Sequence, residues 1–146
     1  MITLDSMSLL QVPCVLKVIL KVIARFRANL PQAHAACETI QGFDFFGTTF
    51  DAVVAWGVMF HLSEADQAET ILKVSQHLRP GGLFLFTAGE EEGIREGVMN
   101  DVSFSYISLG ATAYRQLLLQ CGLKELDEYA DEWDNYVFVA KKIAKP

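Results

Sequence analysis

Two short apolar runs constrain the fold of this chain most strongly. Asp51 to Trp56 and Leu83 to Thr87 consist almost entirely of hydrophobic and aromatic residues. Runs of this length without polar alternation are typical of strands that are buried on both faces, as in parallel sheets. The segment between them has helical spacing of its apolar residues, so the order strand, helix, strand predicts an α/β domain.

The helix between the two runs has recognisable ends. Ser63 is its expected N-cap, and the motif Ser63-Glu64-Ala65-Asp66 fits the capping-box pattern loosely. Arg79-Pro80-Gly81-Gly82 is expected to end it, because proline cannot continue a helix and the glycines permit a tight reversal. One face of this helix is expected to carry Ala68, Ile71, Leu72, Ser75 and Leu78.

The first quarter of the chain predicts a helix followed by a short strand. The helix is expected from about Pro13 to Asn29, with a polar stripe of basic residues every four positions. Its β-branched residues leave a strand in part of this segment as an alternative. A membrane-surface helix or a transit peptide is a further alternative, but Val12 to Ile23 is too short and too charged to span a bilayer. Ala33 to Ile40 is the expected short strand.

The second half predicts a loop, a helix and a closing hairpin. Gly89 to about Ser108 is expected to be a polar loop, and Ala111 to Gln120 a helix. Lys124 to Tyr129 and Tyr136 to Lys141 are extended runs with a short link, which favours an antiparallel pair. We therefore expect a single domain over residues 1–146, with a mostly parallel sheet and one antiparallel C-terminal strand.

Composition and charge exclude several classes of protein. The chain has 146 residues, of which 51% are hydrophobic, so it can form one sizeable core. A net charge of −6 argues against sequence-independent nucleic-acid binding. The three cysteines are odd in number, far apart and not at zinc-ligand spacing, so we expect no metal site, a reducing setting and a cytoplasmic location.

The order and spacing of these motifs carry a resemblance to a known family. The segments that carry it are Phe50–Gly57, Phe60–Ser63, Leu78–Gly82, Leu83–Thr87, Ala113–Leu118 and Cys121–Leu123, with Phe26–Pro31 and Cys37-Glu38 upstream. Together they resemble the C-terminal part of class I S-adenosylmethionine-dependent methyltransferases. The resemblance implies a Rossmann-like fold, S-adenosylmethionine as cofactor and methyl transfer to a small-molecule acceptor.

The resemblance also implies which residues form the site. Glu38, Thr39, Ile40 and Gln41 would meet the adenine, Trp56, Gly57, Val58 and Phe60 would line the cofactor and acceptor pocket, and Asp5 would bind the ribose hydroxyls. His61 is the candidate catalytic base. The alternatives are that Glu38 ends a strand in solvent, that Trp56 belongs to the core, and that His61 only flanks a helix.

Two further groups of residues belong to the edge at which such sheets bind ligands. Glu90 to Glu92 follow the second buried strand and are expected to shape an acceptor site or to form a solvated charge run. Trp133, Asn135 and Tyr136 are expected to fold over the same edge.

The main departure from the family lies near the start of the chain. The family opens with a strand and a glycine-rich loop that approaches the cofactor, but no glycine occurs here before Gly42. We therefore expect an N-terminally incomplete fold in which residues 1–25 are divergent or replaced. The sheet would then have an open edge that a homo-oligomer would cover. A noncatalytic remnant that acts as a binding module is the alternative function.

Overall fold

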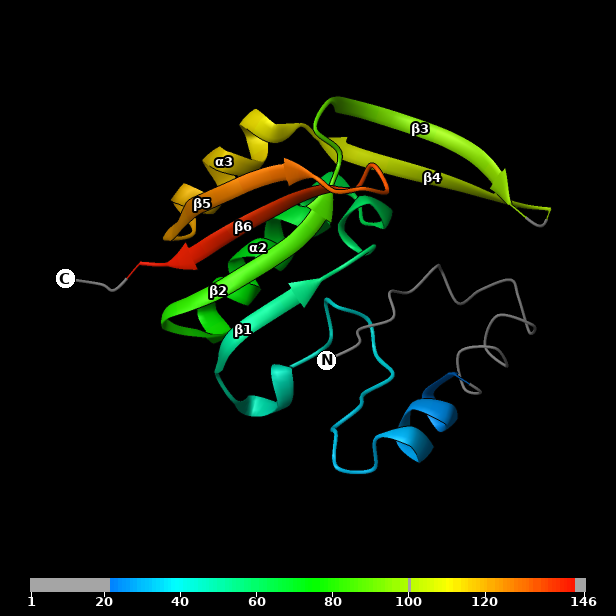
Figure 1. Cartoon of the computed structure of the whole chain (residues 1–146), viewed down its shortest axis with the longest axis vertical. Coiled ribbons are helices and arrows are strands. Elements are labelled where there is room, and N and C mark those ends of the chain that lie inside the picture. The colour runs from blue at the N-terminus through cyan, green and yellow to red at the C-terminus, as the bar shows by residue number, and fades with distance from the viewer. Residues whose placement is uncertain (1–21, 100, 144–146) are drawn as a thin grey trace. The chain divides into compact units, whose positions relative to one another are not determined.

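The computed structural model describes residues 22–99 and 101–143, and the chain divides into two compact units (Figure 1). The first unit is Met1–Asp44 and the second is Phe45–Pro146. Each unit is described by itself below.

The described part of the first unit contains one helix, over residues 22–29. It confirms the end of the predicted N-terminal helix, whose beginning lies outside the described residues. Arg27 Nη2 donates to the carbonyl of Ala35 at 3.1 Å and ties the following turn to the helix. The predicted strand at Ala33–Ile40 is wrong, because this segment forms turns and irregular backbone. Its three alanines have low strand propensity, and the Thr39 carbonyl accepts a local hydrogen bond from Phe43 N at 2.9 Å.

The second unit is built on a four-stranded sheet with the strand order β1-β2-β6-β5. The strands are β1 (Phe50–Ala55), β2 (Leu78–Ala88), β5 (Leu123–Ala130) and β6 (Tyr136–Lys142). β1 pairs with β2 in parallel, and β6 pairs antiparallel with both β2 and β5. Three strands therefore run in one direction and the C-terminal strand runs against them, which confirms the predicted α/β fold class.

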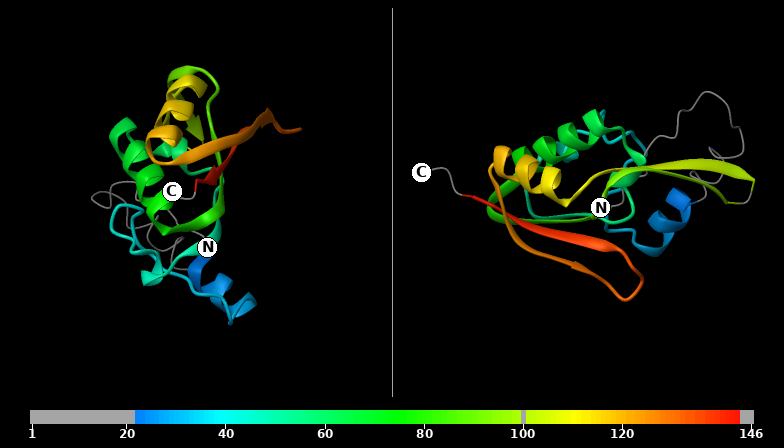
Figure 2. Two further views of the ribbon diagram at one scale, coloured as in Figure 1. Left: turned by 90° about the vertical axis from the view of Figure 1, so that its left-hand side faces the viewer. Right: turned by 90° about the horizontal axis from the view of Figure 1, so that it is seen from above.

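Two helices cover one face of this sheet, α2 (Glu64–His77) and α3 (Ala111–Gln120) (Figure 2). Ser63 caps α2 as predicted: its Oγ accepts from Asp66 N at 3.2 Å. The buried residues of α2 are Gln67, Thr70, Ile71, Val74 and Ser75. Leu72, predicted on the buried face, is exposed, because the face that meets the sheet is rotated toward the polar residues Gln67 and Thr70.

Aromatic side chains form the centre of the core between the sheet and these helices, together with aliphatic residues such as Ile71, Val74 and Leu118. Phe86 stacks on Phe84 and Phe138 with ring centroids 4.8 and 4.9 Å apart, and Tyr114 of α3 meets Phe86 edge-on at 5.6 Å. These four rings are fully buried. They fix β2, β6 and α3 relative to one another. They therefore also fix the positions at which β2 and β6 end.

The predicted reversal at Arg79–Gly82 is an irregularity within β2. β1 and β2 pair at Phe50 with Leu78 and again at Ala52 with Leu83, with a register shift in between. Arg79 Nη1 donates to both carboxylate oxygens of Asp51, at 2.8 and 2.7 Å, and bridges this bulge. Gly81 adopts a φ of 83°, which a residue without a Cβ tolerates.

The segment predicted as a polar loop instead forms a β-hairpin. β3 (Glu92–Met99) and β4 (Val102–Leu109) pair antiparallel as a separate two-stranded sheet. Gly97 is essential to its packing, because a Cβ there would lie 2.4 Å from Cζ of Phe104. The Phe104 ring covers the glycine on the opposite strand and supplies the cross-strand contact that the missing side chain cannot.

Candidate functional site

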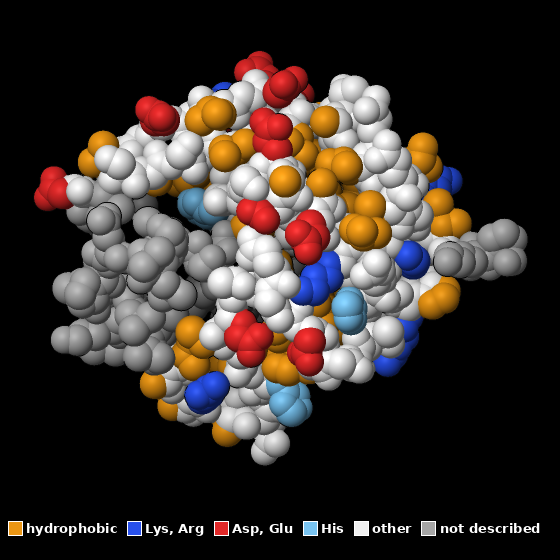
Figure 3. Space-filling model, turned by 180° about the vertical axis from the view of Figure 1, so that it is seen from behind, with side chains coloured by type: hydrophobic (Ala, Val, Ile, Leu, Met, Phe, Trp, Pro, Cys, Tyr) orange, Lys and Arg blue, Asp and Glu red, His pale blue; other side chains and the backbone are white. Residues whose placement is uncertain are grey.

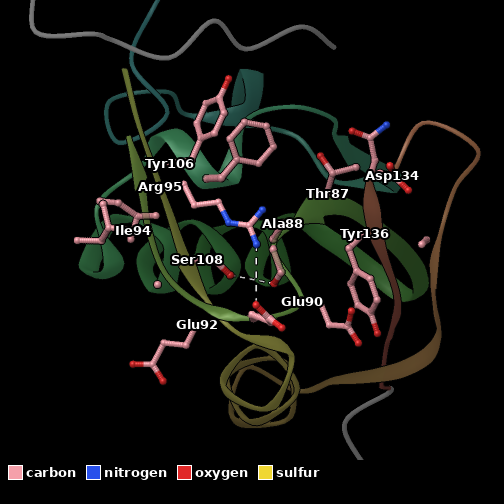
Figure 4. A pocket seen from close by; sticks show the side chains of 17 residues that line it. Thr87, Ala88, Glu90, Glu92, Ile94, Arg95, Tyr106, Ser108, Asp134 and Tyr136 are labelled. Atoms are coloured by element: carbon pink, nitrogen blue, oxygen red, sulfur yellow. Dashed lines mark hydrogen bonds and ion pairs between the residues drawn. The ribbon is translucent and has the colours of Figure 1, made fainter. Parts of the chain in front are cut away.

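A cavity of about 630 Å³ opens where β2 ends (Figure 4). It is bounded by the end of β2, the base of the β3–β4 hairpin and the loop between β5 and β6. Its lining comprises Phe60, Thr87, Ala88, Gly89, Glu90, Glu91, Glu92, Gly93, Ile94, Arg95, Tyr106, Ile107, Ser108, Ala130, Asp134, Asn135 and Tyr136. The carboxyl ends of the parallel strands in open α/β sheets are the usual place for ligands, and this cavity has the size of a small-molecule site.

Aromatic residues form one wall of the cavity. Phe60 lies within the short helix η2 (Met59–His61), and its ring is 4.8 Å from that of Tyr106 in β4. The His61 ring lies 5.0 Å from Tyr106 and 4.8 Å from Phe60. His61 is exposed and contacts this wall without lining the cavity, so its catalytic role stays a prediction.

The turn after β1 is tied to the end of β2. Gly57 adopts a φ of 68°, and its N–H donates to Thr87 Oγ1 at 2.8 Å. Trp56 is 48% exposed and does not belong to the buried core. Of the four pocket residues predicted here, Phe60 lines the cavity, while Trp56, Gly57 and Val58 form the turn that precedes it.

The other predicted cofactor residues lie outside the second unit. Asp5 lies outside the described residues. Glu38, Thr39, Ile40 and Gln41 belong to the first unit, where Thr39 Oγ1 accepts from Gly42 N at 3.1 Å. Their predicted contact with the adenine therefore stays a prediction.

Carboxylates dominate the charge of the cavity. Glu90, Glu91 and Glu92 line it, as predicted for the acceptor edge, and Asp134 joins them from the β5–β6 loop. Arg95 reaches in from β3, and its Nη2 lies 3.9 Å from Glu91 Oε2 (Figure 4). Because Arg95 is the one cation among the lining residues of this cavity in the described chain, the cavity has a net negative charge.

The pKa of Tyr136 reflects the negative charge around the cavity. Burial raises its pKa, and the hydrogen bond to Glu128 and the negative charges of Glu128 and Glu90 raise it further. Glu128 is in turn paired with Arg115 of α3. Tyr136 therefore stays protonated at neutral pH and presents a neutral ring and hydroxyl to the cavity.

The β5–β6 loop is held by a single carboxylate. Asp131 Oδ1 accepts from the backbone N–H groups of Trp133 and Asn135, and Oδ2 accepts from Asn135 Nδ2, each at 2.9 Å. The side-chain hydrogen bond from Asn135, helped by the two backbone donors, lowers the pKa of Asp131. Asn135 and Tyr136 line the cavity as predicted, whereas Trp133 is 74% exposed and does not.

Sequence reasoning missed the hairpin residues of the cavity, among them Tyr106, Ile107 and Ser108. The signal was present, because Val102, Phe104 and Tyr106 alternate with serines in the pattern of a half-buried strand. The three glutamates and two glycines nearby favoured a loop instead.

Two kinds of site are not found in the described residues. No group of three or more His, Cys, Asp or Glu side chains there is placed to hold a metal ion. No helix in this part of the chain has the length and apolar character needed to cross a membrane.

Comparisons with known proteins agree with this architecture. Residues 17–82 match the family model described as a methyltransferase domain. A search of curated protein sequences gave no match.

Three solved structures illustrate the shared fold. The 1,6-didemethyltoxoflavin-N1-methyltransferase of Burkholderia thailandensis, solved with 1,6-didemethyltoxoflavin and S-adenosylhomocysteine, is 18% identical with a TM-score of 0.66 over 84% of this chain and 56% of its own. An S-adenosylmethionine-dependent methyltransferase of Clostridium acetobutylicum is 13% identical with a TM-score of 0.68 over 88% of this chain and 72% of its own. The amino pentose methyltransferase CalS10 of Micromonospora echinaspora, solved with S-adenosylmethionine, is 17% identical with a TM-score of 0.65 over 84% of this chain and 70% of its own. The chain thus spans 56% of the first of these proteins, and the predicted resemblance is confirmed.

Proposed function

We propose that this chain, whose fold is that of the class I S-adenosylmethionine-dependent methyltransferases, takes part in methyl transfer from S-adenosylmethionine to a small-molecule acceptor. The observation that carries the proposal is the cavity at the carboxyl ends of β1 and β2, beside the turn at Trp56–Val58. In this fold class that edge is where ligands bind. The catalytic activity belongs to the proposal, as does the identity of the acceptor.

The residues at this edge suit a cationic sulfonium cofactor. Trp56 and Phe60 offer aromatic surface, and the nearby carboxylates favour positive charge. At Gly57 no atom lies within 4 Å of the position that a Cβ would occupy, so a ligand can approach the backbone closely. We assign cofactor binding to Trp56, Gly57, Val58 and Phe60, and in the first unit to Asp5, Glu38, Thr39, Ile40 and Gln41.

The cofactor, when bound, supplies a methyl group activated by the positive sulfur. The chain then has to hold the acceptor in line with that methyl group and to exclude water, more than to supply an acid or base. The aromatic wall of Phe60 and Tyr106 suits the first task. His61, which contacts both rings, is the proposed group that accepts a proton from the acceptor.

The charge of the cavity lining also indicates which kind of acceptor the cavity favours. A cavity with four carboxylates and one guanidinium favours a neutral or cationic small molecule over a polyanion. On the face shown in Figure 3, basic side chains are interspersed with acidic and hydrophobic ones. We propose that the acceptor is not a nucleic acid and that the protein acts in the cytoplasm.

A noncatalytic binding module is the second candidate, and one observation favours it. The sequence contains no glycine before Gly42, so the glycine-rich loop that the family uses to hold the cofactor does not occur in it. The outer edge of β1 pairs with no strand among the described residues. In the proposal a homo-oligomer covers that edge.

Titration calorimetry of the full chain with S-adenosylmethionine separates the two candidates. The proposal predicts a dissociation constant below about 100 μM, or about −5.5 kcal/mol. Replacing Trp56 with alanine should weaken binding at least about tenfold, since a stacked aromatic contact is lost. Replacing Trp133, the other tryptophan and a more exposed one, with alanine is the matched control and should leave the affinity unchanged. Absence of heat at millimolar ligand would leave only the binding module.

A further inference from the structure

We propose that Thr87 is a positioning residue whose hydroxyl holds the backbone of Gly57 and so fixes the turn at Trp56–Val58. The inference rests on the proposed function, because it concerns the turn to which cofactor binding is assigned. Thr87 itself acts through Gly57.

The ladder between β1 and β2 explains why Gly57 needs a partner. The last paired residues are Ala55 and Phe86, after which β1 ends. Gly57 turns away with a φ of 68°, so its N–H leaves the regular ladder. Thr87 Oγ1 accepts this N–H at 2.8 Å and satisfies a backbone donor that would otherwise have no protein acceptor at the end of the strand.

The surroundings make this hydrogen bond the main constraint on the Gly57 peptide. Apart from the two adjacent residues, no atom lies within 4 Å of an ideal Cβ at Gly57, so no distant side chain packs at that position. Thr87, in contrast, is 1% exposed and sits in a central strand between β1 and β6. A buried hydroxyl in a central strand therefore sets the position of the half-buried Gly57 peptide.

Thr87 also connects the turn to the cavity. It lines the cavity at the end of β2, and the next residues along the chain, Ala88 to Glu92, line it as well (Figure 4). The same side chain thus fixes where the β1 turn lies relative to the cavity floor. Thr87 therefore aligns the turn at Trp56–Val58 with the part of the cavity lining that follows β2.

Substitutions at Thr87 separate the hydroxyl from the shape of the side chain. Thr87→Val keeps the β-branched form but removes the acceptor, whereas Thr87→Ser keeps the acceptor. Ser75→Ala is the matched control away from the site, because Ser75 is also 1% exposed and its Oγ donates to the Cys121 carbonyl at 2.6 Å. It removes a buried hydroxyl that links two segments without touching the turn.

Two measurements on the full chain test the inference. Amide hydrogen exchange should be about tenfold faster at Gly57 in Thr87→Val, and unchanged in Thr87→Ser and Ser75→Ala. The dissociation constant for S-adenosylmethionine should rise about tenfold in Thr87→Val, and by less than about threefold in the other two variants. Thermal unfolding of all three variants shows that a loss of affinity does not follow from stability alone.

The outcomes distinguish the inference from the proposed function. Unchanged exchange at Gly57 in Thr87→Val overturns the positioning role, whether or not the cofactor binds. Faster exchange with unchanged affinity also overturns it, because the turn would then not matter for binding. If the wild-type chain binds no cofactor, the proposed function fails, whereas faster exchange at Gly57 in Thr87→Val still supports the role of the Thr87 hydroxyl in fixing the turn.

Discussion

Replacing Phe86 with alanine should lower the free energy of unfolding by about 3–5 kcal/mol. The ring is fully buried and touches three others, with centroids 4.8 Å from Phe84, 4.9 Å from Phe138 and 5.6 Å from Tyr114. The variant loses the burial of the ring. The cavity that remains also deprives the neighbouring side chains of their dispersion contacts with the ring. Urea denaturation followed by circular dichroism measures the change.

The control for Phe86→Ala lies on the outside of α3. Leu119 is exposed, so Leu119→Ala should change the free energy of unfolding by less than about 0.5 kcal/mol. Equal effects of the two substitutions would contradict the packing of β2, β6 and α3 around one aromatic core.

Gln67→Leu should destabilise the chain by roughly 3 kcal/mol, although it places a hydrophobic residue in the core. Gln67 is fully buried; its Nε2 donates to the carbonyls of Leu62 and Ile107, at 3.1 and 2.9 Å. Its Oε1 accepts from Tyr114 Oη at 2.6 Å. Leucine removes all three hydrogen bonds and leaves two carbonyls and a hydroxyl without these partners in a buried place. Thermal and urea unfolding check the loss.

Two comparisons make this prediction specific. Gln76→Leu changes an exposed glutamine of the same helix and should leave stability within about 0.5 kcal/mol of wild type. Burial raises the pKa of Tyr114, so its hydroxyl stays protonated and donates to Gln67 at neutral pH. A double-mutant cycle of Gln67→Leu with Tyr114→Phe should therefore show coupling of about 1 kcal/mol or more, and additive effects would contradict the contact.

Those elements that have a strong local pattern were predicted from the sequence. The apolar runs at Asp51–Trp56 and Leu83–Thr87 became β1 and the last part of β2, and Ser63 capped α2. The expected burial on both faces is wrong for β1, where Ala52 and Val54 are exposed, because α2 and α3 cover only one face of the sheet. The C-terminal hairpin also formed, with β6 inserted between β2 and β5. In each case hydrophobic period and capping residues pointed to the same structure, so that no distant contact was needed to decide it.

Tertiary contacts overrode the local pattern elsewhere. Glu90–Glu92 and the nearby glycines favour a loop at β3–β4, yet the segment forms a hairpin in which Phe104 packs over Gly97. Gln67 is not among the residues that the sequence predicts on the buried face of α2, but it is buried by contacts with residues 40 and 47 positions later in the chain. A single sequence does not contain the information that pairs such positions.

The residues of the site were likewise predictable where the local pattern is strong, and not where distant contacts decide their positions. Its place at the ends of the buried strands could be predicted, and Phe60, the three glutamates, Asn135 and Tyr136 line the cavity. Thr87 was recognised only as the end of a strand, because its partner Gly57 lies 30 residues earlier. Trp133 differed from expectation because the Asp131 carboxylate closes the loop tightly and leaves the indole in solvent.

The central claim is that the edge formed by the ends of β1 and β2 binds the sulfonium cofactor. The direct measurement is amide hydrogen exchange of the full chain with and without S-adenosylhomocysteine, the stable product of the proposed reaction. We predict slower exchange at Trp56–Phe60 and at Thr87–Glu92, and no change along α3 beyond its first turn. Unchanged exchange at both segments under saturating ligand, or protection confined to other parts of the chain, would contradict the account.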